Sequence, residues 1–121
     1  MAYRTPVVGL TDRTTAHLFA ADAQGQPCAI EVGTPRWFAW LGQAPLFRYQ
    51  HPEMGCFTAR RETRRSTIAW YAYRKVCGRQ LTAYLGQSEA LTAARLLTVA
   101  QQLTLKEATM RAVRDPPPVA S

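Results

Sequence analysis

Short stretches in which apolar and polar residues alternate recur in the first third of the chain, and this two-residue period is typical of half-buried β-strands. Two such stretches, residues 14–20 (TTAHLFA) and 27–32 (PCAIEV), flank the turn-forming segment ADAQGQ. The pattern predicts a β-hairpin. Residues 1–13 are expected to form a flexible N-terminal tail, because Thr, Pro, Gly and Asp interrupt any period there.

The residues after this hairpin favour a short helix. Thr34 can cap its first turn, and Pro35 suits the first helical position because the N–H group that proline lacks would have no partner there. Gly42 can end the helix. Four large apolar residues crowd it, namely Trp37, Phe38, Trp40 and Leu41. The two tryptophans are expected in the core, with a ligand cage as the less favoured alternative.

The middle of the chain predicts an antiparallel meander. Segments 46–50 (LFRYQ) and 56–62 (CFTARRE) flank a loop with turn-forming residues at both ends. The next two segments, WYAYRKV and RQLTAYLG, meet at Cys77-Gly78. Three strands are therefore expected near residues 56–62, 68–75 and 79–86.

A C-terminal helix is expected to follow, with Thr92 as its N-cap. Its apolar face would consist of residues that recur at helical spacing, namely Leu96, Val99, Ala100 and Leu103. Thr104-Leu105-Lys106-Glu107 fits a capping box, which allows a break and a second short helix. A disordered Pro-rich tail is expected at residues 114–121.

Together these elements predict an α+β fold in a single domain at residues 14–113. An N-terminal β-hairpin and a short helix come first, and a three-stranded antiparallel sheet packed by a C-terminal helix comes next.

The turn at Cys77-Gly78 leaves two registers open for the last two strands. If these two residues alone form the loop, Val76 pairs with Arg79. If Gly78 takes the left-handed position of a three-residue loop, Lys75 pairs with Arg79 instead, and the second strand's faces exchange relative to the first. The longer loop is slightly favoured, because Cys77 would need a positive φ in the shorter one.

In both registers one face of the sheet meets the helix through Leu81, Ala83 and Leu85. The outer face is expected to be polar, aromatic and basic, with Thr58, Arg60, Glu62, Gln80, Thr82 and Tyr84. The two-residue loop adds Tyr71, Tyr73 and Lys75 to this outer face, and the three-residue loop adds Trp70, Ala72 and Arg74 instead.

Positive charge is concentrated on these strands. The chain has a net charge of +7, yet residues 1–55 are neutral and residues 87–121 carry only +1. Residues 56–86 hold seven basic side chains against Glu62 alone. A concentrated basic patch suggests a polyanionic partner.

Several other classes of protein are not indicated. The chain has no run of apolar residues long enough to cross a membrane, and its N-terminus has no secretory signal. A cytoplasmic location is therefore expected. The three cysteines form neither a disulfide framework nor a zinc ribbon, and no metal or cofactor is expected. Catalytic motifs are absent, and no small-molecule substrate is evident, so we expect no enzymatic activity.

The sequence therefore predicts a DNA-binding module that contacts the duplex through a basic three-stranded sheet. Arginine and lysine neutralise phosphates, arginine can also read guanine edges, and a β-ribbon fits the major groove. We expect Arg60, Arg74 and Arg79 near the bases, and Arg61, Arg64, Arg65 and Lys75 on phosphates. Four further residues are candidate contacts that depend on the register: Tyr71, Tyr73, Thr82 and Tyr84.

The segment from Trp70 to Gln101 resembles the arm-type DNA-binding domains of tyrosine recombinases. The shared features are an aromatic and basic strand, a glycine turn, a strand that closes on Leu-Gly, and a helix that starts with leucine and threonine. Here these are Trp70-Tyr71-Ala72-Tyr73-Arg74, Gly78, Tyr84-Leu85-Gly86 and Leu91-Thr92-Ala93-Ala94-Arg95. Plant ethylene-response DNA-binding domains are similar in outline. In both families the sheet enters the major groove, which the resemblance implies here for Arg60, Arg74, Arg79 and Thr82.

A longer stretch, residues 14–103, is similar to the N-terminal segment of large bacterial LuxR-type, MalT-like transcriptional regulators. The shared order is Gly-Thr-Pro-x-Trp-Phe-x-Trp-Leu, Phe-Thr-Ala-Arg-Arg-Glu, Trp-Tyr-x-Tyr-Arg and Tyr-Leu-Gly-x-Ser-Glu-x-Leu-Thr. Those regulators continue into a nucleotide-binding domain, and this chain stops after Pro-Pro-Pro, so ATP binding is not carried over. The resemblance implies bacterial transcription regulation and leaves the target open. Another regulatory protein is a further candidate partner.

Two alternatives stay open. One is a protein-interaction module that docks a partner through the sheet edge or its aromatic face. The other is an RNA-binding sheet whose tyrosines stack on unpaired bases.

Overall fold

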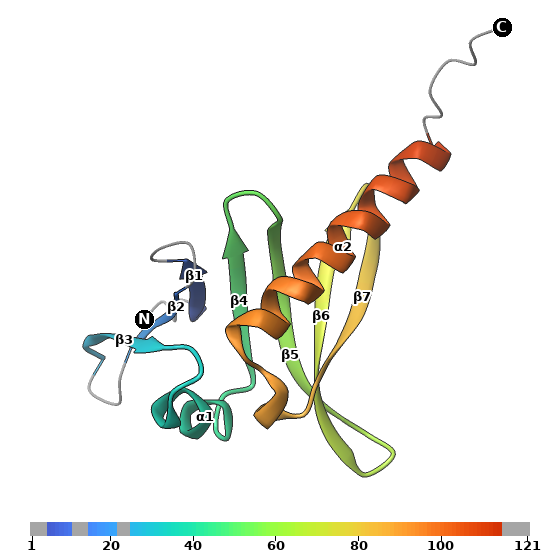
Figure 1. Cartoon of the computed structure of the whole chain (residues 1–121). Coiled ribbons are helices and arrows are strands. Elements are labelled where there is room, and N and C mark those ends of the chain that lie inside the picture. Colours follow the sequence, from blue (N-terminus) through green and yellow to red (C-terminus); the bar gives the residue numbers. More distant parts are fainter. Residues whose placement is uncertain (1–4, 11–14, 22–24, 115–121) are drawn as a thin grey trace, which may run out of the picture.

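The computed structural model describes residues 5–10, 15–21 and 25–114. Its seven strands form one mixed sheet in the order β3-β2-β1-β4-β5-β6-β7, accompanied by two α-helices and one turn of 3-10 helix (Figure 1). The elements in chain order are β1 (Val7–Leu10), β2 (Ala16–Ala21), β3 (Pro27–Glu31), α1 (Pro35–Leu41), β4 (Leu46–His51), β5 (Gly55–Arg64), β6 (Thr67–Val76), β7 (Arg79–Gly86), η1 (Ser88–Ala90) and α2 (Ala93–Arg114).

Both helices pack against the same face of the sheet, which we call the helix face. Trp37 of α1 is fully buried and meets Phe47 of β4 edge-on, with the ring centroids 5.4 Å apart. Leu96 and Leu103 of α2 are buried in the same core, and α2 crosses β5, β6 and β7 (Figure 1). Neither helix covers the opposite face, which we call the open face.

The expected α+β class is confirmed, and the sheet is larger than expected. The hairpin β2–β3, the helix α1 and the antiparallel meander β5–β6–β7 all form. Thr34 caps α1 as expected, since its side chain accepts a hydrogen bond from the Trp37 amide. These parts are not a hairpin beside a three-stranded sheet, however, because β1 and β4 join them into one sheet.

The joining strand lies within the segment that the sequence assigned to a flexible tail. Residues 7–10 form β1, which pairs antiparallel with β2 and parallel with β4. Val8 is fully buried between these partners. The prediction of a tail was therefore wrong for residues 7–10, because β4, one of the two strands that order them, lies about 40 residues further along the chain. Residues 1–4 and 11–13 of the expected tail lie outside the described residues.

The C-terminal helix starts as expected and does not break where a break was allowed. The Thr92 side chain accepts a hydrogen bond from the Arg95 amide, and α2 then continues to Arg114. Because α2 is unbroken at Thr104, this residue caps no second helix, and its hydroxyl donates to the Met54 carbonyl at 2.9 Å. Except for Arg114, the expected Pro-rich tail lies outside the described residues.

The register at Cys77-Gly78 is that of the two-residue loop. Val76 pairs with Arg79, and Cys77 and Gly78 have φ values of 51° and 79°. The slight preference for the longer loop was wrong. Positive φ at both central residues gives the turn whose twist matches the flanking strands, and this match outweighs the cost of a left-handed cysteine. A bulge then lets Trp70 pair with Gly86.

Leu85 and Leu96 both belong to the core between the sheet and α2, and both are fully buried. We expect Leu85→Ala and Leu96→Ala each to lower the free energy of unfolding by about 2–5 kcal/mol, through lost burial and the cavity left behind. Thr82→Ala, on the exposed side of the same strand, should cost much less. Chemical denaturation measures all three variants, and a larger loss at Thr82 would reverse the assignment of the two faces.

Candidate functional site

The open face carries two rows of side chains that run across four strands. In the first row Arg48 of β4 is followed by Thr58, Tyr73 and Thr82, each paired with the next across the ladder. In the second row Leu46 is followed by Arg60, Tyr71 and Tyr84. Strand pairing thus places side chains from a segment of nearly 40 residues on one continuous surface.

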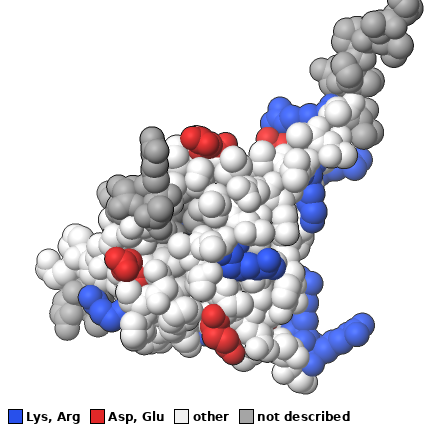
Figure 2. Space-filling model, in the orientation of Figure 1, with Lys and Arg blue, Asp and Glu red and all other residues white. Residues whose placement is uncertain are grey.

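This surface is basic. Arg48, Arg60 and Lys75 are exposed on it, and Arg64 lies at the end of β5. Glu62 is the one acidic residue in strands β4 to β7. The helix face differs, because acidic and basic side chains are both scattered over it between uncharged ones (Figure 2).

Glu62 does not stand as a free negative charge on the open face. Its carboxylate accepts hydrogen bonds from the Arg64 guanidinium, with Nη2 at 3.0 Å and Nε at 3.3 Å. The Tyr73 hydroxyl donates to the second carboxylate oxygen. Arg64 also donates to the Tyr73 hydroxyl at 3.1 Å. The three side chains form a closed polar cluster in which Glu62 is neutralised.

The cluster shifts the acid–base behaviour of its members. The hydrogen bond from Tyr73 lowers the pKa of Glu62, and the hydrogen bond and charge of Arg64 lower it further. Partial burial and the same hydrogen bond raise the pKa of Tyr73. Both groups therefore hold the charge states that make their contact, a carboxylate and a neutral phenol, over a wide range around neutral pH.

Aromatic rings continue this cluster toward β7. The Arg64 guanidinium carbon lies 3.8 Å from the centroid of the Tyr71 ring, which is the geometry of a cation–π contact. Tyr71 in turn meets Tyr84 edge-on at 5.5 Å, and Tyr84 is 51% exposed. Flat, exposed aromatic surface beside cationic groups can stack on bases or pack against sugars.

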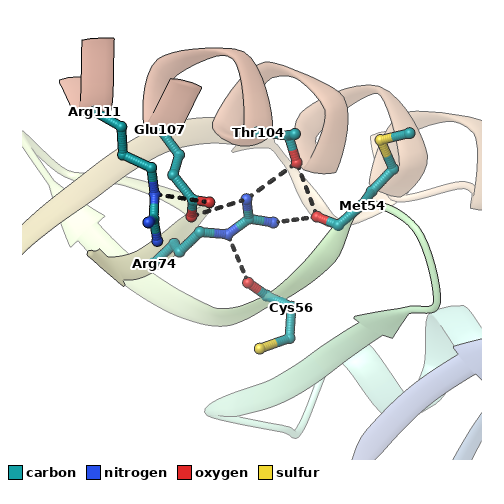
Figure 3. A network of polar contacts seen from close by, with 6 residues as sticks. All are labelled: Met54, Cys56, Arg74, Thr104, Glu107 and Arg111. Atoms are coloured by element: carbon teal, nitrogen blue, oxygen red, sulfur yellow. Dashed lines mark hydrogen bonds and ion pairs between the residues drawn. The ribbon is translucent and has the colours of Figure 1, made fainter. Parts of the chain in front are cut away.

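Arg74, which was expected near the bases, lies on the helix face. Arg74 is only 8% exposed and sits between β5, β6 and α2 (Figure 3). Its guanidinium donates to the carbonyls of Cys56 (2.8 Å) and Met54 (2.6 Å) and to the Thr104 hydroxyl (3.1 Å), and it lies 3.9 Å from Glu107. The prediction that Arg74 contacts bases was therefore wrong, because the N–H groups of its guanidinium bind the β4–β5 turn to α2.

Arg61 and Arg79 also leave the open face. Arg61 donates to the carbonyls of Leu41 and Gly42, at 3.2 and 2.8 Å, and so satisfies the C-terminal end of α1. Arg79 is exposed, but it pairs with the buried Val76 and therefore starts from the helix face. Strand alternation excludes both residues from the surface that carries Arg60.

The remaining predicted residues stay together. Six lie on the open face, namely Arg60, Tyr71, Tyr73, Lys75, Thr82 and Tyr84, and Arg64 and Arg65 lie where its longest hairpin ends. Arg48 was missed. The charge count placed it in a neutral segment, and only the pairing of β4 with β5 brings it beside Thr58.

The free edge of β7 is covered by side chains from α2. Lys106 donates to the Thr82 carbonyl at 2.9 Å, and Arg95 donates to the carbonyls of Tyr84 and Leu85 at 2.8 and 3.0 Å. These contacts use the acceptors that an added strand would need. The edge is therefore poorly suited to docking a peptide strand.

Comparisons with protein-family models, with curated proteins and with solved structures find no match to this chain. Among its described helices, none is long and apolar enough to cross a membrane. Within the same described residues, no three His, Cys, Asp or Glu side chains gather so that they could hold a metal ion. What the open face binds must therefore be inferred from its own side chains.

The different roles of two arginines can be separated by stability. Arg74→Met should lower the free energy of unfolding by about 3 kcal/mol, because it leaves the Met54 and Cys56 carbonyls without their charged donor. Arg60→Met, at an exposed position, should change it by less than about 0.5 kcal/mol. Urea denaturation compares them, and equal midpoints would contradict the structural role of Arg74.

The Glu62 cluster should make the stability of the protein depend on pH in both the acidic and the alkaline range. Because the folded pKa of Glu62 is lowered, its contribution is present above about pH 4.3 and is lost as the pH falls through the folded value. Because the folded pKa of Tyr73 is raised, its contribution is present below about pH 10 and is lost as the pH rises through the folded value. Thermal unfolding of the wild type and of Tyr73→Phe should therefore differ most near neutral pH and converge in acid and in alkali. A constant difference across this range would argue against the cluster.

Proposed function

We propose that the protein binds double-stranded DNA and that the open face of β4, β5, β6 and β7 is the surface that meets the duplex. The observation that carries this proposal is the one-sided packing of the sheet. Both helices cover one face, and the opposite face is left with exposed basic groups and tyrosines on adjacent strands.

Each group has a role that its position supports. Arg60 lies between Leu46 and Tyr71 in the middle of the open face, where its planar fork can reach base edges in the major groove. Arg48 and Lys75 lie on strands to either side of β5 and suit phosphate contacts. Thr82 and Tyr84 add uncharged hydrogen-bonding groups on β7.

The Glu62 cluster makes this surface compatible with a polyanion. A lone carboxylate would repel phosphates, whereas Glu62 is paired with Arg64 and Tyr73. The pairing also holds Arg64 over Tyr71, so less side-chain entropy is lost when DNA binds. A role in bacterial transcription regulation, which the sequence resemblance implies, is part of the same proposal.

Single-stranded nucleic acid is the second candidate, and the exposed ring of Tyr84 beside Tyr71 favours it. A surface that stacks unpaired bases would bind single strands more tightly than duplexes of the same sequence. Competition between a single strand and its duplex decides between the two candidates.

Binding should be electrostatic and confined to the open face. In fluorescence anisotropy titrations with a random-sequence duplex, we expect affinity to fall by one or more decades between about 50 and 200 mM salt. Changing Arg48, Arg60 and Lys75 together to Gln should weaken binding and flatten the salt dependence by about 0.9 in logarithmic slope for each phosphate that the variant no longer neutralises.

The matched control removes three positive charges from elsewhere, at Arg36, Arg79 and Arg111, which are exposed and do not lie on the open face. This control variant should keep most of the affinity and most of the salt dependence. Equal losses in the two triple variants would mean that net charge, and not the open face, is responsible.

A further inference from the structure

The β5–β6 hairpin projects beyond the rest of the sheet (Figure 1). The last ladder pair of β5 with β4 is Arg60 with Leu46, and the last pair of β6 with β7 is Trp70 with Gly86. Residues 62–69, which we call the hairpin tip, pair only with one another. At about 3.3 Å per residue, the turn lies roughly 15 Å beyond Arg60.

The turn at the end of this tip has an unusual composition for its geometry. Arg65 and Ser66 have φ values of 51° and 65°, so both central residues of a two-residue loop are left-handed. Asn-Gly is the sequence that such a turn favours, because left-handed backbone is costly for residues with ordinary side chains. The chain places arginine and serine at these costly positions, whereas the Cys77-Gly78 turn has glycine at its second position, and strain of this kind is often found at functional sites.

The two arginines at the tip, Arg64 and Arg65, differ in their side-chain contacts. Arg64 is held on the open face by Glu62, Tyr73 and Tyr71. Arg65 is exposed, and among the described residues it has no hydrogen bond or ion pair.

We propose that Arg65 enters the minor groove next to the stretch of major groove that the open face occupies. The major groove is about 12 Å wide, so a tip that extends roughly 15 Å from Arg60 passes the phosphate backbone bordering it. Arginine is drawn to the negative potential of a narrow minor groove. This inference rests on the proposed function and assigns the same duplex a second point of contact.

The test uses two duplexes that differ only in the minor groove. Alternating I·C and alternating G·C duplexes present the same major-groove atoms, and only guanine places an amino group in the minor groove. If Arg65 reads the minor groove, the wild-type protein should bind the I·C duplex about tenfold more tightly than the G·C duplex.

The informative variant carries Arg65→Asn and Ser66→Gly together. It gives the turn its favoured sequence, so a change in binding cannot be ascribed to unfolding, and its thermal midpoint should rise. It should bind the two duplexes equally while keeping the salt dependence that the open face provides. Ser66→Gly alone relaxes one strained residue, retains Arg65 and should keep the preference for I·C.

Each other outcome has a distinct meaning. If the wild type binds both duplexes equally, or if the double variant keeps the preference, the minor-groove contact is overturned and the proposed function stands. If the wild type binds no duplex, the proposed function fails and this inference fails with it.

Discussion

Trp37 connects the parts of the molecule that lie far apart in sequence. It is fully buried, its ring meets Phe47 of β4, and Phe47 meets Trp70 of β6 at 5.3 Å. Its indole N–H donates to the Leu91 carbonyl at 2.7 Å, at the entry to α2. One side chain thus links α1, the centre of the sheet and the start of the C-terminal helix. A buried tryptophan stabilises the fold through its large apolar area, and the hydrogen bond of its N–H group fixes the orientation of its ring. Because this contact holds both helices on one side of the sheet, the exposure of the other face follows from it.

Strand alternation then decides which charges can meet a partner. On β6, Tyr71, Tyr73 and Lys75 point to the open face, and Trp70 and Arg74 point to the helix face. A buried guanidinium is tolerated only when its donors are satisfied, and Arg74 meets this condition through carbonyls, a hydroxyl and a nearby carboxylate. Gly55 takes part in the same arrangement, because a Cβ there would lie 3.3 Å from Arg74 Nη2. The number of basic residues in a segment therefore does not show which of them share a surface, because the strand register assigns each side chain to one face.

The sequence predicts the local elements of this fold and not the way they join. The caps at Thr34 and Thr92 and the strands β5, β6 and β7 have signals within a few residues, and all of them form. Strand β1 is four residues long, and its order depends on pairing with Arg48–Gln50, about 40 residues away. Arg48 and Arg74 illustrate the same limit for the site. One is brought to the open face by β4–β5 pairing, and the other is captured by Thr104 and by carbonyls of a distant turn.

On the side of the sheet formed by β5, β6 and β7, few surfaces remain free to contact a binding partner. Lys106 and Arg95 occupy the carbonyls along the free edge of β7, and α1 and α2 cover the helix face. Of the exposed basic groups on β5, β6, β7 and their turns, all except Arg79 lie on the open face or at the hairpin tip. A ladder of paired strands loses little backbone entropy on binding, so the contacts of its side chains contribute to affinity without first having to order a loop. An extended polyanion such as DNA is opposite in charge to both surfaces. One continuous duplex is also long enough to contact the open face and the hairpin tip together.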